Sequence, residues 1–249
     1  MTFSDIFSKK NENRTIFLNF NEGFCIFVKN NAKMKPFERW KYEEIELTFG
    51  TERVKNLPAL TEWLTADEPA DDFETKTLKI YHDQLVRKVD AWNEDELKFF
   101  FLSHIITLVD FSKPKVYSSF SQRTVATKRN DIHGNEVDLR GRIEFFVAMG
   151  EQIPRQPFFF LHEYKPLNKT TPSDPLGQLL IAMLATQTMN EIHRPLYGTY
   201  IRGSSWQFVV LDGNQYSVSK AYDALEESEL FKIFSILKRC KSYIEAWVK

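Results

Sequence analysis

Two glutamates and a lysine have the types and the spacing of a site for phosphodiester hydrolysis. Glu163 and Lys165 end a segment that opens with a continuous apolar run, and Glu144 lies near the end of the preceding segment of alternating residues. Carboxylates from neighbouring strands can converge on a hard cation such as Mg²⁺, which takes oxygen ligands. Side chains two residues apart on a strand share a face, so the Lys165 ammonium could hold a water or a phosphate oxygen beside that cation.

The Glu-x-Lys spacing alone is weak, so its surroundings decide its meaning. It occurs at Glu74/Lys76, Glu96/Lys98 and Glu163/Lys165. The first two pairs lie in segments that we interpret as a loop and a helix. Only the third follows an apolar run typical of a strand buried on both faces. An ion pair at the edge of a sheet is the competing interpretation of that third pair.

The elements that must position these residues are predicted from the spacing of the apolar residues. Helical spacing covers residues 78–92, and Asn93 with Glu96 forms a capping box that begins a second helix over the apolar run 97–109. Alternation on both sides of the turn at 130–135 predicts a hairpin. The remaining predicted elements are the strand 157–165, the helix 177–189, the strands 196–202, 206–211 and 216–219, and the helix 226–248.

The first 75 residues differ in character from the rest. Short β-rich runs alternate there with polar breaks, at 15–20, 24–28 and 44–49, which predicts a few strands plus a short helical piece. Residues 62–75 hold six acidic residues, a proline and no basic residue, which predicts a solvated loop. We therefore expect an N-terminal α+β extension over residues 1–75 and a main domain over residues 76–249.

The order of these elements and the residues on them resemble the PD-(D/E)XK nuclease superfamily. That superfamily has a restriction-endonuclease-like αβββαβ core, in which a mixed central sheet is flanked by helices. The resemblance covers residues 76–220. Residues 92–98 and 175–184 also look like a group of uncharacterised bacterial members of the superfamily. An α/β (α+β) fold with this core is what the resemblance implies.

The resemblance also implies a role for each candidate residue. Glu144 on the second core strand and Glu163 on the third would hold Mg²⁺ or Mn²⁺, and Lys165 would position the attacking water. Gln178 would support the site from the helix after the third strand. Glu94 would be the site glutamate that the superfamily often has on the first helix. We prefer it to Glu96, because Glu96 already takes part in a capping box.

One departure from the superfamily leaves a second hypothesis open. Glu144 stands where the superfamily usually has Asp, and its side chain is one methylene longer. The chain is therefore either a metal-dependent DNA nuclease or an inactive protein of the same fold that binds nucleic acid or protein. A third and lower-ranked reading is an α/β binder of small ligands, with the Phe-rich strand lining its pocket.

Charge allows a local contact with nucleic acid but not a polyelectrolyte binder. Lys and Arg total 33 against 34 Asp and Glu, for a net charge of −1. Residues 113–142 hold seven basic and three acidic residues, a net of +4, so this hairpin is the expected DNA contact. Tyr117, Phe120 and Trp206 could stack on bases, although core positions are the preferred interpretation.

Other features exclude several classes. Glycine is scarce, at 9 of 249 residues, and no glycine-rich phosphate-binding motif is present. Two cysteines cannot make a disulfide framework or a Cys-rich zinc site. The five histidines have no ligand spacing. No cleavable leader and no apolar run long enough to cross a bilayer are found, so we expect a cytoplasmic protein without membrane contact. The oligomeric state stays open, and a dimer is compatible with the sequence.

Overall fold

The computed structural model describes residues 10–11, 14–19, 25–30, 35–165, 174–190 and 193–248, and divides into two compact units, Met1–Lys35 and Pro36–Lys249. The smaller unit holds an antiparallel sheet of order β1-β2-β3. Its strands are β1 (Lys10–Asn11), β2 (Arg14–Asn19) and β3 (Cys25–Asn30). The strands predicted at 15–20 and 24–28 are confirmed over 15–19 and 25–28, while Phe20 and Phe24 lie outside the described residues.

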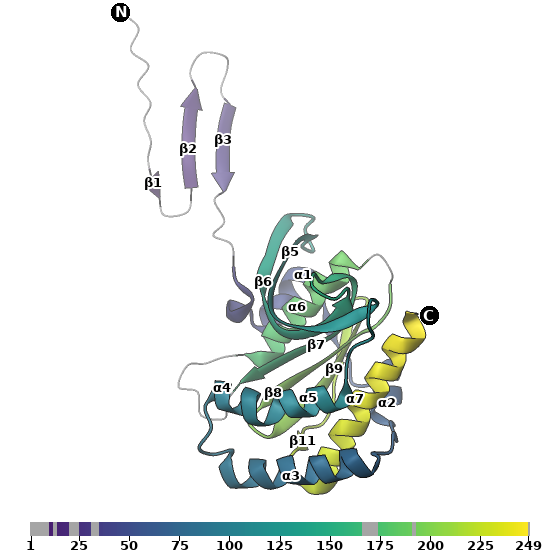
Figure 1. Cartoon of the computed structure of the whole chain (residues 1–249). Coiled ribbons are helices and arrows are strands. Elements are labelled where there is room, and N and C mark those ends of the chain that lie inside the picture. Colours follow the sequence, from purple (N-terminus) through teal and green to yellow (C-terminus); the bar gives the residue numbers. More distant parts are fainter. Residues whose placement is uncertain are drawn as a thin grey trace, which may run out of the picture. The chain divides into compact units, whose positions relative to one another are not determined.

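The larger unit is a mixed α/β structure (Figure 1). Its elements in chain order are η1 (Phe37–Arg39), α1 (Tyr42–Phe49), β4 (Glu52–Arg53), α2 (Pro58–Leu64), α3 (Asp72–Lys88), α4 (Glu94–Leu97), the π-helical segment η2 (Lys98–Leu102), α5 (Ser103–Val109), β5 (Tyr117–Asn130), β6 (Glu136–Met149), β7 (Arg155–Lys165), α6 (Pro175–Met189), β8 (Leu196–Arg202), β9 (Ser205–Asp212), β10 (Gln215–Val218), β11 (Tyr222–Asp223) and α7 (Glu227–Trp247). The helices and strands predicted after residue 76 are all confirmed as elements of the predicted type.

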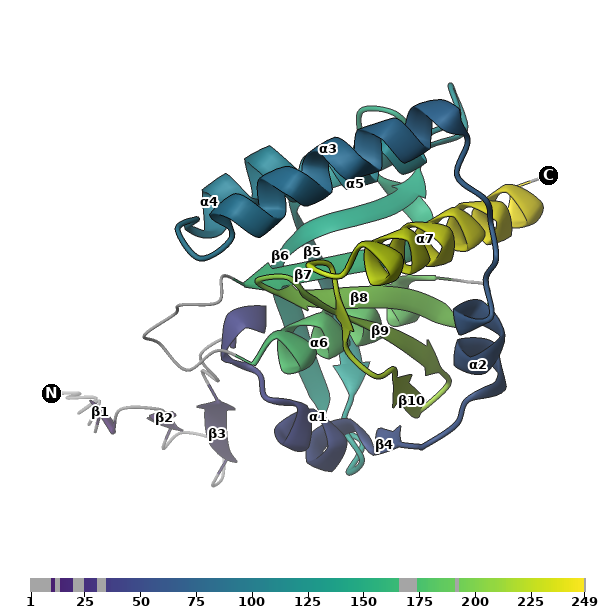
Figure 2. The same cartoon turned by 90° about the horizontal axis from the view of Figure 1, so that it is seen from below.

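The central sheet is mixed, with strand order β4-β10-β9-β8-β7-β6-β5 and β11 paired to β9. Strands β5, β6 and β7 form an antiparallel meander, and β8 lies parallel to β7. Figures 1 and 2 show α3, α5 and α7 on one face of the sheet and α6 with α1 on the other. Each face has its own apolar cluster, so β7 is buried from both sides. This burial explains the continuous apolar run at its start.

The strand predicted at 44–49 is wrong, because these residues form helix α1. The alternation of Ile45, Leu47 and Phe49 imitates a strand face. In the helix, Ile45 and Phe49 lie four residues apart on the buried side, while Leu47 is 76% exposed. The buried pair therefore follows helical spacing, and the apolar Leu47 was the misleading residue.

Residues 36–75 pack into the larger unit, whereas the sequence predicted a boundary near residue 75. Trp63 on α2 is fully buried, and its indole N–H donates to the carbonyl oxygen of Ile236 on α7 at 2.8 Å. The acidic segment 62–75 also differs from the predicted loop, because it contains the end of α2 and the start of α3. Asp71 caps α3 in a capping box, which explains part of the acidic excess.

For the helix over 177–189, the sequence also predicts Asp174 as the N-cap and Pro175 at the start, and α6 begins in this way. The Asp174 carboxylate accepts from the backbone N–H of Gly177 at 2.9 Å and from that of Tyr42 at 2.8 Å. It therefore joins α6 to the start of α1.

Replacing Asp174 by alanine is expected to lower the free energy of unfolding by about 1–2 kcal/mol, because the helix loses its cap and Tyr42 loses an acceptor. Urea denaturation measures the change. Asp67→Ala in an exposed loop is the matched control. Equal effects of the two substitutions would contradict the capping role.

Candidate functional site

Glu144 and Glu163 lie on the neighbouring antiparallel strands β6 and β7. The register pairs Phe145 with His162, so the same pairing continued by one residue sets Glu144 opposite Glu163. The two groups interact electrostatically, since the charge of Glu144 contributes to a raised pKa of Glu163. Glu163 lies near the end of β7, as predicted, whereas Glu144 lies inside β6 and not near its end. The structure thus brings together the two acids that the sequence offered as metal ligands.

Glu163 and Lys165 form a buried ion pair at the end of β7. They are 3% and 6% exposed, and the Lys165 ammonium donates to Oε1 of Glu163. Burial raises the pKa of Glu163 to about 8, against the opposing effect of the Lys165 charge, and the charges of Glu144 and Glu94 raise it further. Lys165 therefore faces Glu163 and not bulk solvent, as predicted.

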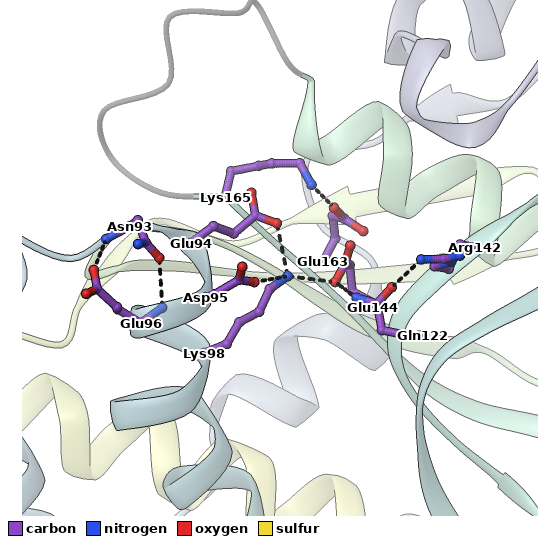
Figure 3. A network of polar contacts seen from close by, with 10 residues as sticks. All are labelled: Asn93, Glu94, Asp95, Glu96, Lys98, Gln122, Arg142, Glu144, Glu163 and Lys165. Carbon is purple, nitrogen blue, oxygen red and sulfur yellow. Dashed lines mark hydrogen bonds and ion pairs between the residues drawn. The ribbon is translucent and has the colours of Figure 1, made fainter.

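A second lysine, which the sequence analysis did not select, lies among the acids. The Lys98 ammonium is 3.0 Å from Oε1 of Glu94, 3.1 Å from Oε2 of Glu144 and 3.7 Å from Oδ1 of Asp95 (Figure 3). Burial works to lower the pKa of Lys98, but its bonds to Glu94 and Glu144 outweigh burial and the pKa is raised. We call Glu94, Lys98, Glu144, Glu163 and Lys165 the Glu–Lys cluster.

The preference for Glu94 over Glu96 agrees with the contacts of both residues. Glu96 accepts from the backbone N–H of Asn93 at 2.8 Å, and Asn93 accepts from that of Glu96 at 3.0 Å, which completes the predicted capping box. Glu94 is the residue that contacts the Glu–Lys cluster, through Lys98. The four-residue spacing of Glu94 and Lys98 was the available sequence signal for Lys98.

Gln122 on β5 also contacts Glu144, and no sequence pattern pointed to it. Its Nε2 donates to Oε2 of Glu144, and its Oε1 accepts from Arg142 at 3.4 Å. Its backbone φ of 56° lies in the left-handed region, which costs a non-glycine residue about 1–2 kcal/mol. Such strained positions cluster at functional sites. Through its two side-chain hydrogen bonds, Gln122 links Glu144 to the exposed Arg142 of the hairpin.

Gln178 is buried in the first turn of α6, with 4% exposure. A glutamine in the first turn of a helix can also be an exposed residue without a role, and the burial of Gln178 contradicts that alternative. Helix α6 packs against β7, the strand that carries Glu163 and Lys165. A polar side chain buried in this otherwise apolar helix needs hydrogen-bonding partners, so Gln178 stays a candidate for supporting the site.

A cleft opens between the helical segment α4–α5 and strands β5, β6 and β7. Its volume is about 920 Å³, and Lys98 and Glu144 of the Glu–Lys cluster belong to its wall. We call it the helix–sheet cleft. The residues that line it are Asn93, Asp95, Glu96, Lys98, Phe99, Phe100, Leu102, Ser103, Ile106, Thr107, Ser119, Ser121, Gln122, Glu144, Phe145, His162 and Tyr164.

His162 lines this cleft and was not selected from the sequence. It is 2% exposed, and neither ring nitrogen has a hydrogen-bond partner among the described residues. Burial lowers its pKa to about 3, so the ring is neutral at pH 7. A buried polar group without a partner costs about 1–3 kcal/mol. Only tertiary packing reveals this feature, because the histidine spacing in the sequence carries no signal.

The predicted DNA-contacting hairpin is formed by β5 and β6, and its charges have different surroundings. Arg123, Arg140 and Arg142 are exposed. Arg129 is half-buried and bonds to polar side chains of α6 and of the β9–β10 turn. The aromatic residues offered for stacking are core residues, as preferred: Tyr117 and Trp206 are fully buried and Phe120 is 4% exposed.

The donor set of the Glu–Lys cluster suits a hard divalent cation. Among the described residues, no group of three or more His, Cys, Asp or Glu side chains is arranged to hold a metal ion. Mg²⁺ is usually bound by one or two carboxylates together with waters and substrate phosphates. Glu144 and Glu163 have the number and type of protein ligands that such a site needs, and the raised pKa of Glu163 is caused mainly by its burial.

No protein-family model matches the sequence, and no curated protein matches it. The fold therefore defines the class of protein no further than a mixed α/β protein with a multi-stranded mixed sheet. Within the described part of the chain, none of the helices is both long and apolar enough to span a membrane.

Proposed function

We propose that the chain is a metal-dependent phosphodiester hydrolase of the PD-(D/E)XK type that acts on DNA. The observation that carries the proposal is the buried Glu163–Lys165 pair at the end of β7, set opposite Glu144 on β6. Buried ion pairs cost desolvation energy and are weak evidence for stability alone. A catalytic use explains why two charges are kept inside the sheet at this position.

The succession of elements supports a restriction-endonuclease-like core. The helical segment α4–α5 comes first, followed by the meander β5-β6-β7, then α6 and β8. This order is αβββαβ, with β8 parallel to β7. Glu94, Glu144, Glu163 and Gln178 lie on the elements that correspond to the positions of the superfamily motif.

In the proposed reaction, Glu144 and Glu163 would hold Mg²⁺ or Mn²⁺, and Glu94 would add negative charge to the site. Such an ion would supply Lewis-acid activation of the phosphate and of a water. Lys165 would hold the attacking water beside Glu163. Gln178 orients this end of β7 from α6. The hairpin 113–142 contributes its exposed arginines to the phosphate backbone.

A cleavage assay with labelled DNA tests the proposal directly. The full chain is incubated with Mg²⁺ or Mn²⁺ and compared with Glu163→Gln, which removes the ligand charge at nearly constant shape. Metal-dependent products from the parent protein alone are expected. Equal product from both proteins would attribute the cleavage to a contaminant, and absence of cleavage from single-stranded and duplex DNA with either metal would contradict the proposal.

The position of Lys98 favours a second candidate, a non-catalytic protein of the same fold. Its ammonium bonds to Glu94 and Glu144 and remains charged, so it already supplies a cation to two of the acids. In that case the Glu–Lys cluster is a set of internal ion pairs, and the hairpin serves nucleic-acid or protein binding without hydrolysis.

Replacing Lys98 by methionine separates the two candidates. Removal of a cation that competes for Glu144 is expected to tighten Mn²⁺ binding about tenfold, which corresponds to about 1.4 kcal/mol. Isothermal titration calorimetry measures the affinity. The matched control is Lys128→Met, which breaks an exposed pair with Glu136. If neither the parent nor Lys98→Met binds Mn²⁺, the ion-pair interpretation holds and the metal site is wrong.

Mn²⁺ affinity is also expected to rise with pH. A ligand carboxyl must lose its proton before it binds a metal, and the pKa of Glu163 is raised to about 8. The site is then largely protonated at pH 6 and half-deprotonated at pH 8, so the apparent affinity should increase about 50-fold between these values. Titrations in buffers of different ionisation enthalpy measure the released proton. A pH-independent affinity would contradict a role for Glu163 as a ligand.

A further inference from the structure

The helix–sheet cleft has an aromatic wall that faces solvent. Phe99 and Phe100 on η2 are 71% and 38% exposed, and both line the cleft. Their rings lie 5.4 Å apart, and Trp92 lies 5.9 Å from Phe100. Large apolar side chains gathered at an exposed concave surface mark a binding site. Flat aromatic rings suit a planar ligand that can stack on them.

The cleft also presents a buried polar group that lacks a partner. His162 is held edge-on by Phe145, Tyr164 and Trp206, with ring centroids 5.4–6.0 Å away. Neither of its ring nitrogens is bonded within the described part of the chain. A neutral imidazole offers one donor and one acceptor. A planar ligand with polar atoms on its edge would therefore find stacking surfaces and a hydrogen-bonding partner in one cleft.

The cleft is continuous with the Glu–Lys cluster. Lys98 and Glu144 belong to both, so a ligand in the cleft lies beside the acids that would hold the metal. A nucleotide has the corresponding layout, since a planar base is joined through a sugar to a phosphate. If a metal held by Glu144 binds the phosphate, the base of the same or the next nucleotide can reach the cleft, because Glu144 belongs to the wall of the cleft.

The charges around the cleft differ between its two ends, so they favour one orientation of a bound strand. Asp95 and Glu96 lie at its α4 end and would repel a phosphate there. At the opposite wall, Gln122 accepts from the exposed Arg142 of the hairpin. A phosphate backbone is therefore favoured along the β5–β6 side, and the base would point towards the helical wall.

We propose that the helix–sheet cleft receives an unpaired base of a nucleic acid strand. The base stacks on the ring of Phe99 and meets the perpendicular ring of Phe100 edge-on, with its polar edge towards His162. The identity of the ligand rests on the proposed function, because the adjoining acids suggest a phosphodiester. A base inside a continuous duplex is paired and stacked and cannot enter. The substrate class that follows is single-stranded or frayed DNA in preference to blunt duplex.

Fluorescence anisotropy with the full-length Glu163→Gln protein in Mg²⁺ tests base entry without cleavage. The probes are a labelled 12-nucleotide single strand, the blunt duplex of the same sequence, and a 12-unit abasic strand with the same backbone charge. The single strand is expected to bind at least about tenfold more tightly than the other two. Equal affinities for the three probes would overturn the proposal, because binding would then depend on backbone charge alone.

Substitutions in the cleft identify where the base binds. Phe99→Ala is expected to weaken single-strand binding at least about fivefold. Phe73→Ala is the matched control, since Phe73 is 70% exposed on α3 and does not line the cleft. His162→Phe keeps the ring contacts and removes both nitrogens, so it should weaken binding without lowering the melting temperature. Equal affinities for Phe99→Ala and Phe73→Ala, or unchanged binding by His162→Phe, would overturn the assignment of the cleft.

Cleavage by the parent protein separates this inference from the proposed function. If the cleft substitutions weaken single-strand binding but no metal supports cleavage, base binding in the cleft is supported and the proposed hydrolase function is contradicted. If the parent cleaves single strand and duplex equally, and Phe99→Ala cleaves as the parent does, the hydrolase function is supported and base binding in the cleft is contradicted.

Discussion

Replacing Lys165 by methionine is expected to lower metal-dependent DNA cleavage by at least about 10²-fold. The Lys165 ammonium lies against Glu163, where the attacking water would be held. Methionine has a similar volume and no charge, so the water would lose its positioning group while the two carboxylates remain. Single-turnover cleavage at saturating Mg²⁺ isolates the chemical step from substrate binding. Mn²⁺ binding by the same variant should be retained at high pH, because Glu144 and Glu163 are unchanged, and should weaken near neutral pH, because Lys165 no longer lowers the pKa of Glu163.

A matched control removes a lysine from a pair that has no place in the proposed chemistry. Lys220 contacts Glu229 at 2.8 Å, and the two side chains are 64% and 28% exposed. Lys220→Met should cleave at the parent rate. If Lys165→Met also retains the parent rate, while circular dichroism shows both proteins folded, Lys165 is only an ion-pair partner and the proposed mechanism is wrong.

Local signals predicted most of the larger unit. The capping box at Asn93 and the N-cap Asp174 followed by Pro175 each depend on residues close together in the chain, so helix starts could be located from sequence. The hairpin of β5 and β6 followed from alternation around a single turn. Helix α1 was misread because three apolar residues at alternate positions match a strand, and only packing distinguishes buried Ile45 from exposed Leu47.

The candidate site was predicted in part, for the same physical reason. Glu144, Glu163 and Lys165 lie on adjacent strands whose order the sequence indicated. Lys98 and Gln122 reach the acids through tertiary contacts, from η2 and from a residue of β5 with positive φ. The ring of His162 lacks a hydrogen-bond partner among the residues that the structure describes, because aromatic side chains from other strands, Phe145 on β6 and Trp206 on β9, pack around it. Spacing within one segment indicates the pairing of Lys98 with Glu94, but it carries no information about the contacts of Lys98 and Gln122 with Glu144.

The two lysines of the cluster therefore have opposite consequences for the proposed function. Lys165 contacts Oε1 of Glu163 at the end of β7, where the proposed reaction needs a group to hold the attacking water. Lys98 bonds to Glu144 itself and competes with a metal for the same oxygen atom as Gln122 does. Catalysis requires that a divalent cation and a phosphate displace this ammonium, and the Lys98→Met titration measures the cost of that displacement.

A double-mutant cycle on the buried pair separates stability from chemistry. Lys165→Met alone should lower the free energy of unfolding by about 3 kcal/mol or more, because it leaves the buried Glu163 without its partner. Glu163→Gln alone should be destabilising as well, since it leaves a buried ammonium.

The double variant should lie within about 1 kcal/mol of the parent protein, because both buried charges are gone and the shapes are kept. Urea denaturation at pH 9, above the pKa of about 8 at which Glu163 loses its proton, measures all four proteins. Single effects that add up in the double variant would contradict the coupling of the pair. A stable double variant that fails to cleave DNA would instead show that the two charges are needed for the reaction and are dispensable for the fold.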